Sequence, residues 1–183
     1  TQVTDLSQLF ENMSSIPDHL KDIDLSTWDT SHVTTMSHAF RNSRIFSEEN
    51  LATRKRSINI ESREKRLYID DIYIGPYFTG YDSLSRQLDI TAWDVSSVKY
   101  FDYTFYNTSF NQAITYWDTT SALWMESMFE DAHVFNQPLK WETNNVLDFS
   151  KMFKNARNFN QDIISEVFTK PDKPDLTYFY WNT

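Results

Sequence analysis

One pattern of apolar positions recurs along the chain. Trp93, Trp117 and Trp141 are 24 residues apart, and Trp28 heads an earlier copy of the pattern. Five, eight, eleven and twelve places after each tryptophan the residues are mostly apolar, and the N-terminus carries the same set without a tryptophan. The sets are Val3, Leu6, Leu9 and Phe10; Val33, Met36, Ala39 and Phe40; Val98, Phe101, Thr104 and Phe105; Ala122, Met125, Met128 and Phe129; Val146, Phe149, Met152 and Phe153.

Apolar offsets of three and four residues are typical of one face of an amphipathic helix, so each set predicts a short helix. The segments ahead of these sets read WDTSHV, WDVSSV, WDTTSA and WETNNV. Asp29, Asp94 and Asp118 are therefore interpreted as helix N-caps that also complement the helix dipole. Paired carboxylates could also serve acid–base chemistry, but their recurrence once per repeat favours capping.

Between one predicted helix and the next tryptophan lie FNQAITYW, FNQPLKW and FNQDII, in which β-branched and aromatic residues predict a single strand. We expect Asn111, Asn136 and Asn160 to bridge successive repeats as an amide ladder, because an amide carries both a donor and an acceptor. Phe110, Phe135 and Phe159 would fill the layer beside it. A row of amides that reads a sugar or an ice surface is the alternative, and the flanking phenylalanines argue against it because they should bury the triplet.

One strand and one short helix in 24 residues lies within the range of leucine-rich-type repeats. The predicted fold class is thus α/β: a leucine-rich-repeat-like right-handed solenoid, with a parallel sheet on one face and short helices on the other. We interpret residues 1–183 as a single repeat domain, with N-terminal repeats in 1–48 and further repeats in 88–164.

Residues 49–87 interrupt the repeat and differ in character. RSINIES and KRLYIDDIYI alternate apolar and polar residues, which predicts a β-hairpin with SREK as its turn. An insertion in a solenoid often lies on the binding face, and its cations suit an acidic partner, a heparin-like glycan or a neighbouring subunit. A solvated hairpin whose charges prevent edge pairing is the alternative. The candidate contact residues are Arg54, Lys55, Arg56, Arg63, Lys65 and Arg66.

Two aromatic features lie outside the repeat pattern. Trp124 is off the apolar register, which predicts an exposed side chain and makes it a candidate contact residue. Residues 165–183 end in LTYFYWNT, which is interpreted as a cap over the last repeat or as a tail that docks onto another chain. Tyr178 and Trp181 are the candidate contacts in that segment.

The amino-acid composition argues against several classes of function. The formal net charge of −9 argues against nucleic acid or an anionic membrane as the main partner. Cysteine is absent and glycine occurs twice, so thiol chemistry, thiolate metal sites and glycine-rich phosphate loops are not expected. The four histidines are scattered without a catalytic or metal-binding spacing. No apolar run approaches the ~18 residues of a membrane span, and the opening TQVTDLSQLF is not typical of a signal peptide. We therefore expect no enzymatic activity, metal or cofactor.

The pattern of FNQ, WD, a Ser two places on, then Val, Met and Met-Phe resembles the BspA-like surface-protein repeat that is abundant in mycoplasma surface lipoproteins. WDTTSALWMESMFEDAHVFNQPL is a close match, whereas Glu142 and Asn144 depart from the pattern and no lipid-anchor cysteine is present. The resemblance implies a surface-exposed, leucine-rich-repeat-like protein concerned with adhesion. We predict a module at the cell surface or outside the cell that binds a protein or glycan through the solenoid face and the basic insertion. A structural component of an envelope or a viral particle is the alternative.

Overall fold

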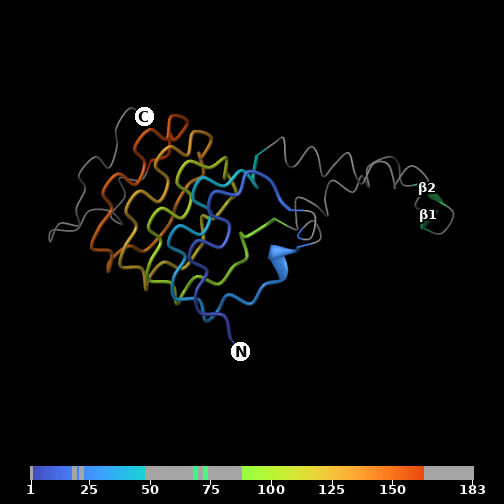
Figure 1. Ribbon diagram of the computed structural model, residues 1–183, viewed down its shortest axis with the longest axis horizontal. Coiled ribbons are helices and arrows are strands. Elements are labelled where there is room, and N and C mark those ends of the chain that lie inside the picture. The colour runs from blue at the N-terminus through green and yellow to red at the C-terminus, as the bar shows by residue number, and fades with distance from the viewer. Residues whose placement is uncertain are drawn as a thin grey trace.

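The computed structural model describes residues 2–17, 20, 23–47, 68–69, 72–73 and 88–162. Successive passes of the chain lie side by side in a stack that runs from the blue N-terminal segment to the red segment near residue 160 (Figure 1). Each pass is called a coil, and the coils are numbered along the chain. Coil 1 is residues 3–13, coil 2 is 33–47, coil 3 is 98–112, coil 4 is 122–137 and coil 5 is 146–161.

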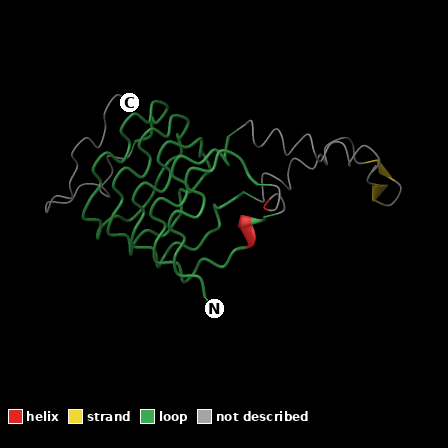
Figure 2. Cartoon of the chain, in the orientation of Figure 1, coloured by secondary structure: helices red, strands yellow, loops and turns green. Residues whose placement is uncertain are grey.

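Regular secondary structure is sparse in the described residues, and most of the chain is drawn as loop (Figure 2). The described elements are the 3-10 helix η2 (Leu25–Thr27) and the strands β1 (Tyr68–Ile69) and β2 (Ile72–Tyr73). The predicted α/β solenoid, with a parallel sheet on one face and short helices on the other, is therefore wrong. Coils meet through isolated parallel bridges instead: Asp5↔Thr35, Thr35↔Tyr100, Tyr100↔Trp124 and Trp124↔Asp148.

The destination of the backbone N–H groups explains why helices do not form. In coil 2, the N–H groups of Met36, His38 and Phe40 donate to carbonyl groups of coil 3 at 2.8–3.0 Å. The N–H groups of Ala39 and Arg41, which follow His38 and Phe40, donate to the carbonyl three residues back. An α-helix would direct every N–H along its own axis to the residue four back. Here alternate N–H groups join neighbouring coils, so the coil cannot also be a helix.

The backbone dihedral angles also show that the coils are not helices. Each coil contains two residues with positive φ, four positions apart, and a right-handed helix tolerates neither. A positive φ at the third residue is the requirement of a type II turn, and Asn and Asp adopt it more readily than other non-glycine residues. The residues are Gln8 and Asn12, His38 and Asn42, Tyr103 and Asn107, Ser127 and Asp131, and Lys151 and Asn155.

The aspartates expected to cap helices cap turns. Asp29 Oδ1 accepts hydrogen bonds from the Ser31 backbone N–H at 3.1 Å and from the Ser31 hydroxyl at 2.6 Å. Asp118 accepts the same pair from Thr120, and Asp94 does so from Ser96. These hydrogen bonds hold the pKa of Asp29 and of Asp118 below the ordinary aspartate value. The bond from the hydroxyl group is the larger cause, and the bond from the backbone N–H is the smaller one. The residue type was predictable, and it forms an Asx-turn rather than a helix N-cap.

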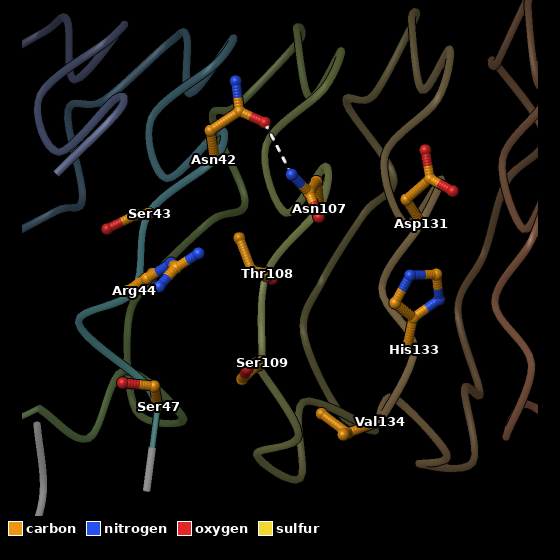
Figure 3. Close-up of a pocket in the computed structure, with 10 residues that line it drawn as sticks. All are labelled: Asn42, Ser43, Arg44, Ser47, Asn107, Thr108, Ser109, Asp131, His133 and Val134. Atoms are coloured by element: carbon orange, nitrogen blue, oxygen red, sulfur yellow. Dashed lines mark hydrogen bonds between the residues drawn. The ribbon is translucent and has the colours of Figure 1, made fainter. Parts of the chain in front are cut away.

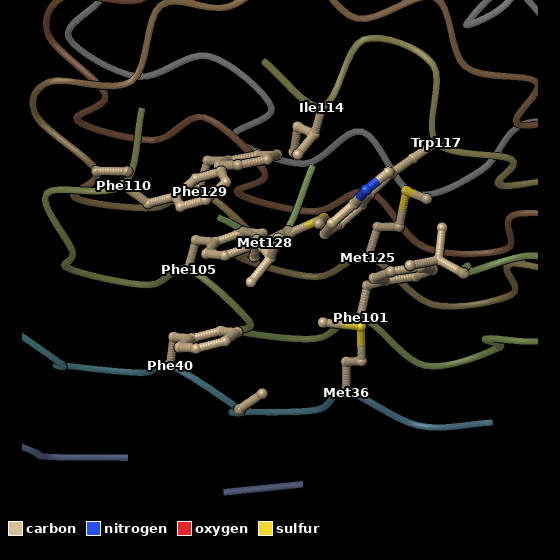
Figure 4. Close-up of a cluster of buried hydrophobic side chains, with 14 of the residues drawn as sticks. Met36, Phe40, Phe101, Phe105, Phe110, Ile114, Trp117, Met125, Met128 and Phe129 are labelled. Atoms are coloured by element: carbon tan, nitrogen blue, oxygen red, sulfur yellow. The ribbon is translucent and has the colours of Figure 1, made fainter. Parts of the chain in front are cut away.

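The core is a set of aromatic columns that run through the stack (Figure 4). Phe105, Phe129 and Phe153 occupy one position of successive coils, with neighbouring ring centroids 5.5 Å apart and nearly parallel planes. Trp117 and Trp141 stack in a second column at 6.4 Å. Burying each such side chain contributes about 1.5–3 kcal/mol, and well-placed ring pairs add about 0.5–1.5 kcal/mol. The 24-residue apolar pattern thus defines a core between coils.

The predicted amide ladder is confirmed, but the expected burial of the FNQ triplet is wrong, because Asn111 and Asn160 are exposed. Asn111 Oδ1 accepts the backbone N–H of Asn136 at 2.9 Å, and Asn136 Oδ1 accepts that of Asn160 at 2.9 Å. The Gln137 and Gln161 side chains donate to the same asparagines. The expected phenylalanine layer is also present, because Phe110, Phe135 and Phe159 are buried and stack at 6.2 and 5.8 Å.

Strands β1 and β2 form an antiparallel pair, with Tyr68 opposite Tyr73 and Ile69 opposite Ile72. The described strand pair therefore lies wholly within KRLYIDDIYI, which was expected to be one strand of the hairpin. RSINIES and the expected turn at SREK lie outside the described residues, and they stay predictions. The limits assigned to the insertion stay predictions.

Candidate binding surfaces

The structure describes one of the nine contact residues expected from the sequence, Trp124. The remaining eight lie outside the described residues, and their contact roles stay predictions: Arg54, Lys55, Arg56, Arg63, Lys65, Arg66, Tyr178 and Trp181.

Trp124 is exposed, as its place off the apolar register predicted, with 38% of its surface accessible. The parallel bridges place its backbone beside Tyr100 of coil 3, which is 41% exposed. Leu147 of coil 5 is 57% exposed, and its N–H donates to the carbonyl of Leu123 in coil 4. Tyr100, Leu123, Trp124 and Leu147 together are called the aromatic strip.

The local sequence explains why these side chains face solvent. Val98, Ala122 and Val146 are buried, and the two residues after each of them lie at the bridge between coils. These residues are Lys99, Tyr100, Trp124 and Leu147, which are exposed, and Leu123 and Asp148, which are half-buried. In coils 1 and 2 the corresponding positions are Thr4 and Asp5, and Thr34 and Thr35. Exposed apolar residues that are scattered singly need no explanation, but adjacent ones indicate a contact surface. Coils 3 to 5 therefore present aromatic and aliphatic side chains, flanked by Lys99 and Asp148, at positions that are Thr or Asp in coils 1 and 2.

A second amide ladder, distinct from the FNQ ladder, runs along the positive-φ asparagines at one corner of the stack. Asn42 Nδ2 donates to Asn12 Oδ1 at 2.9 Å, and Asn107 Nδ2 donates to Asn42 Oδ1 at 3.0 Å. Asn155 Nδ2 donates to Asp131 Oδ1 at 2.9 Å. Asp131 is a carboxylate in the place of an amide, so it has no N–H to offer Asn107. The ladder is interrupted between coils 3 and 4.

A groove of about 320 Å³ lies at this interruption (Figure 3). Asn42, Asn107 and Asp131 line one side of it, and Figure 3 shows them in a row. His133 Nδ1 is 3.0 Å from the carbonyl oxygen of Asn155, so the neutral imidazole carries its proton on Nδ1. Arg44, Ser47, Thr108, Ser109 and Val134 also line the groove. The lining combines donors, acceptors and one apolar side chain.

Sequence reasoning missed this groove. The signal was present in the printed sequence: the position that is Asn12, Asn42, Asn107 and Asn155 in four coils is Asp131 in the other. The aspartate at this position indicates a site only once the stacking order of the coils is known, because Asp131 then lies beside Asn107.

A third candidate surface consists of polar and charged side chains that already contact one another. Arg41 contacts Glu11 at 2.9 Å, and its guanidinium lies 5.8 Å from the centre of the Tyr103 ring. The Tyr103 hydroxyl donates to Glu126 Oε1 at 2.8 Å. The pKa of Tyr103 is raised to about 12, mainly by burial and to a smaller extent by the bond to Glu126. Further pairs join Lys151 to Glu126 at 3.3 Å and Lys154 to Glu130 at 2.6 Å. A ligand would have to break these contacts to bind here.

The part of the chain that the structure describes contains no group of three His, Asp or Glu side chains placed to hold a metal ion. Nor does any described helix have the length and apolar character to cross a membrane. The expectation that the protein is not an enzyme stays a prediction.

The described chain is a stack of coils joined by backbone hydrogen bonds and by aromatic columns. The family model described as DUF285, Mycoplasma protein of unknown function, matches residues 1–59 and 75–176. The chain belongs to this family. A search of the curated proteins and a search of the solved structures each found no match.

Proposed function

We propose that this chain is a non-enzymatic interaction module, displayed at a cell surface, that binds a protein partner through the aromatic strip. The observation that carries the proposal is the pair Tyr100 and Trp124. These side chains lie on neighbouring coils and remain 41% and 38% exposed, while aromatic residues at the core positions of the same coils are buried.

Energetics favour this surface over the paired polar one. Covering Tyr100, Trp124 and Leu147 would remove apolar area from water without breaking a hydrogen bond made by their side chains. Tyr and Trp are enriched among the residues that dominate binding energy, because they bury a large area at a low cost in side-chain entropy. The coils also hold the strip on a backbone already fixed by hydrogen bonds between coils, so little ordering is needed on binding.

Family membership and the repeat pattern support the proposed location. The family is described from Mycoplasma, and the repeat resembles the BspA-like repeat of surface lipoproteins, which supports display at the cell surface and a role in adhesion. The cations of the insertion, Arg54, Lys55, Arg56, Arg63, Lys65 and Arg66, are a second contact region for an acidic protein or glycan.

The test is a double variant, Tyr100→Ser with Trp124→Ser, compared with Tyr116→Ser. Tyr116 is 84% exposed and does not belong to the strip, so it controls for the loss of an exposed aromatic residue. Immobilised proteins would capture partners from a host-cell surface extract, and sedimentation velocity would report self-association. Capture lost in the double variant and kept in Tyr116→Ser supports the proposal.

Two results would redirect the proposal. Capture that is equal for the wild type and the double variant rejects the strip as the contact surface. Self-association of the wild type that the double variant loses supports a structural component of an envelope or particle instead.

A further inference from the structure

We infer that the groove lined by coils 2, 3 and 4 is a binding site for a neutral polyhydroxylated ligand, a sugar residue, centred on the interruption of the second amide ladder at Asn107 and Asp131. The site is separate from the aromatic strip, so the inference does not depend on the proposed protein partner.

The first argument is the missing rung. In the rungs between coils 1 and 2 and between coils 2 and 3, an asparagine Nδ2 fills the Oδ1 of the preceding coil. Asn107 Oδ1 receives no such bond, because Asp131 has only acceptor oxygens. The coils are not spread apart at this point, since the Asn107 backbone N–H donates to the Glu130 carbonyl at 2.8 Å. Two acceptors from adjacent coils therefore face the groove without an amide N–H between them, while Asp131 also accepts from Asn155 and interacts with the Tyr106 hydroxyl.

The second argument is the chemistry that such a pair selects. A ligand group that satisfies both side chains must donate hydrogen bonds, as a hydroxyl, an ammonium group or a metal ion with its water would. The groove lining contains one guanidinium, Arg44, and one carboxylate, Asp131, so a charged ligand meets a like charge on one side. A hydroxyl both donates and accepts, and it suits a lining that offers both roles.

The third argument is size and shape. A volume of about 320 Å³ lies at the lower end of small-molecule sites and suits a single sugar ring. Val134 is 39% exposed at the edge of the groove and offers an apolar contact for the C–H face of such a ring. Contacts this few predict weak binding, with a Kd of about 1 mM.

The decisive variant is Asp131→Asn. Its Nδ2 would donate to Asn107 Oδ1, while its Oδ1 would still accept from Asn155 Nδ2, so the ladder becomes continuous. We expect the midpoint of urea unfolding to rise and the affinity for a sugar to fall about tenfold, as the loss of one charge-assisted hydrogen bond implies. A gain in stability with a loss of binding cannot be explained by unfolding. Asn107→Gly keeps the positive φ, removes the acceptor, and should also weaken binding.

The measurement uses the ¹⁵N-labelled chain and amide chemical shifts. The probes are glucose, galactose, mannose and N-acetylglucosamine, each titrated separately, with glycerol, methylammonium chloride and calcium chloride as comparisons. Saturable shifts at Asn107 and His133 with at least one sugar, weakened in Asp131→Asn and unchanged in Tyr100→Ser with Trp124→Ser, support the inference. Shifts with no sugar, shifts that persist equally in Asp131→Asn, or saturation by methylammonium or calcium alone overturn it.

Discussion

Asn107 Nδ2 donates a hydrogen bond to Asn42 Oδ1 at 3.0 Å across 65 residues of sequence. The bond joins coil 2 to coil 3 directly, although the insertion lies between them in the chain. Both asparagines have positive φ, of 55° at Asn42 and 49° at Asn107. The same residue thus forms the turn within its coil and the contact between coils.

Asn42 tests these two roles separately. Asn42→Gly removes its bonds to Asn12 and Asn107 but keeps a residue that adopts positive φ, whereas Asn42→Ala also places a Cβ in the left-handed region. We expect both variants to be less stable than the wild type, with the alanine variant lower by about a further 1 kcal/mol. Urea unfolding followed by circular dichroism measures the difference. Equal stability of the two variants would contradict the requirement for positive φ.

Substitution of Phe129 is expected to destabilise the protein strongly. It is fully buried and stacks with Phe105 and Phe153 at 5.5 Å and with Phe135 at 4.0 Å. Phe129→Ala should cost about 3–5 kcal/mol in the free energy of unfolding. Tyr116→Ala, at an exposed position, should change it by less than about 0.5 kcal/mol. A small effect at Phe129 would show that neighbouring coils can collapse into the cavity.

Tyr103 should lose its proton at a higher pH than an ordinary tyrosine. Its pKa is raised from 10.0 to about 12 by burial and by the bond to Glu126. Because the folded-state pKa is the higher one, this contribution to stability is complete below pH 10 and is lost as the pH rises through 12. Glu126→Gln should lower the pKa of Tyr103, while burial and the charge of Glu130 continue to raise it. A ¹³C titration of the tyrosine ring measures it, and an unchanged pKa in Glu126→Gln would exclude the carboxylate as a cause.

Removal of residues 49–87, with a short linker in their place, should leave the stack folded. Coils 2 and 3 meet through the bridge between Thr35 and Tyr100 and through the rings of Phe40 and Phe105, whose centroids are 5.6 Å apart. None of these contacts uses an inserted residue. Thermal unfolding should stay cooperative, with a midpoint close to that of the intact chain. Loss of the cooperative transition would mean that the insertion is part of the folding unit.

The amino-acid sequence by itself determined the repeat, the buried positions of coils 2 to 5 and the FNQ ladder, whereas Val3 and Leu9 of the first apolar set are exposed. A side chain that recurs at the same offset must occupy the same environment in every coil, so Phe105, Phe129 and Phe153 could be assigned to the core without a structure. The turn-forming aspartates were recognisable for the same reason, since their short carboxylates bond backbone groups two residues away.

Only the tertiary structure decided the backbone conformation. Apolar offsets of three and four residues describe a helix and also a chain of tight turns, because both return side chains to one side at similar intervals. The choice depends on where the N–H groups find acceptors, and here alternate groups find them in the neighbouring coil. The groove has the same origin, because Asn107 and Asp131 are 24 residues apart and become neighbours when coil 3 lies against coil 4.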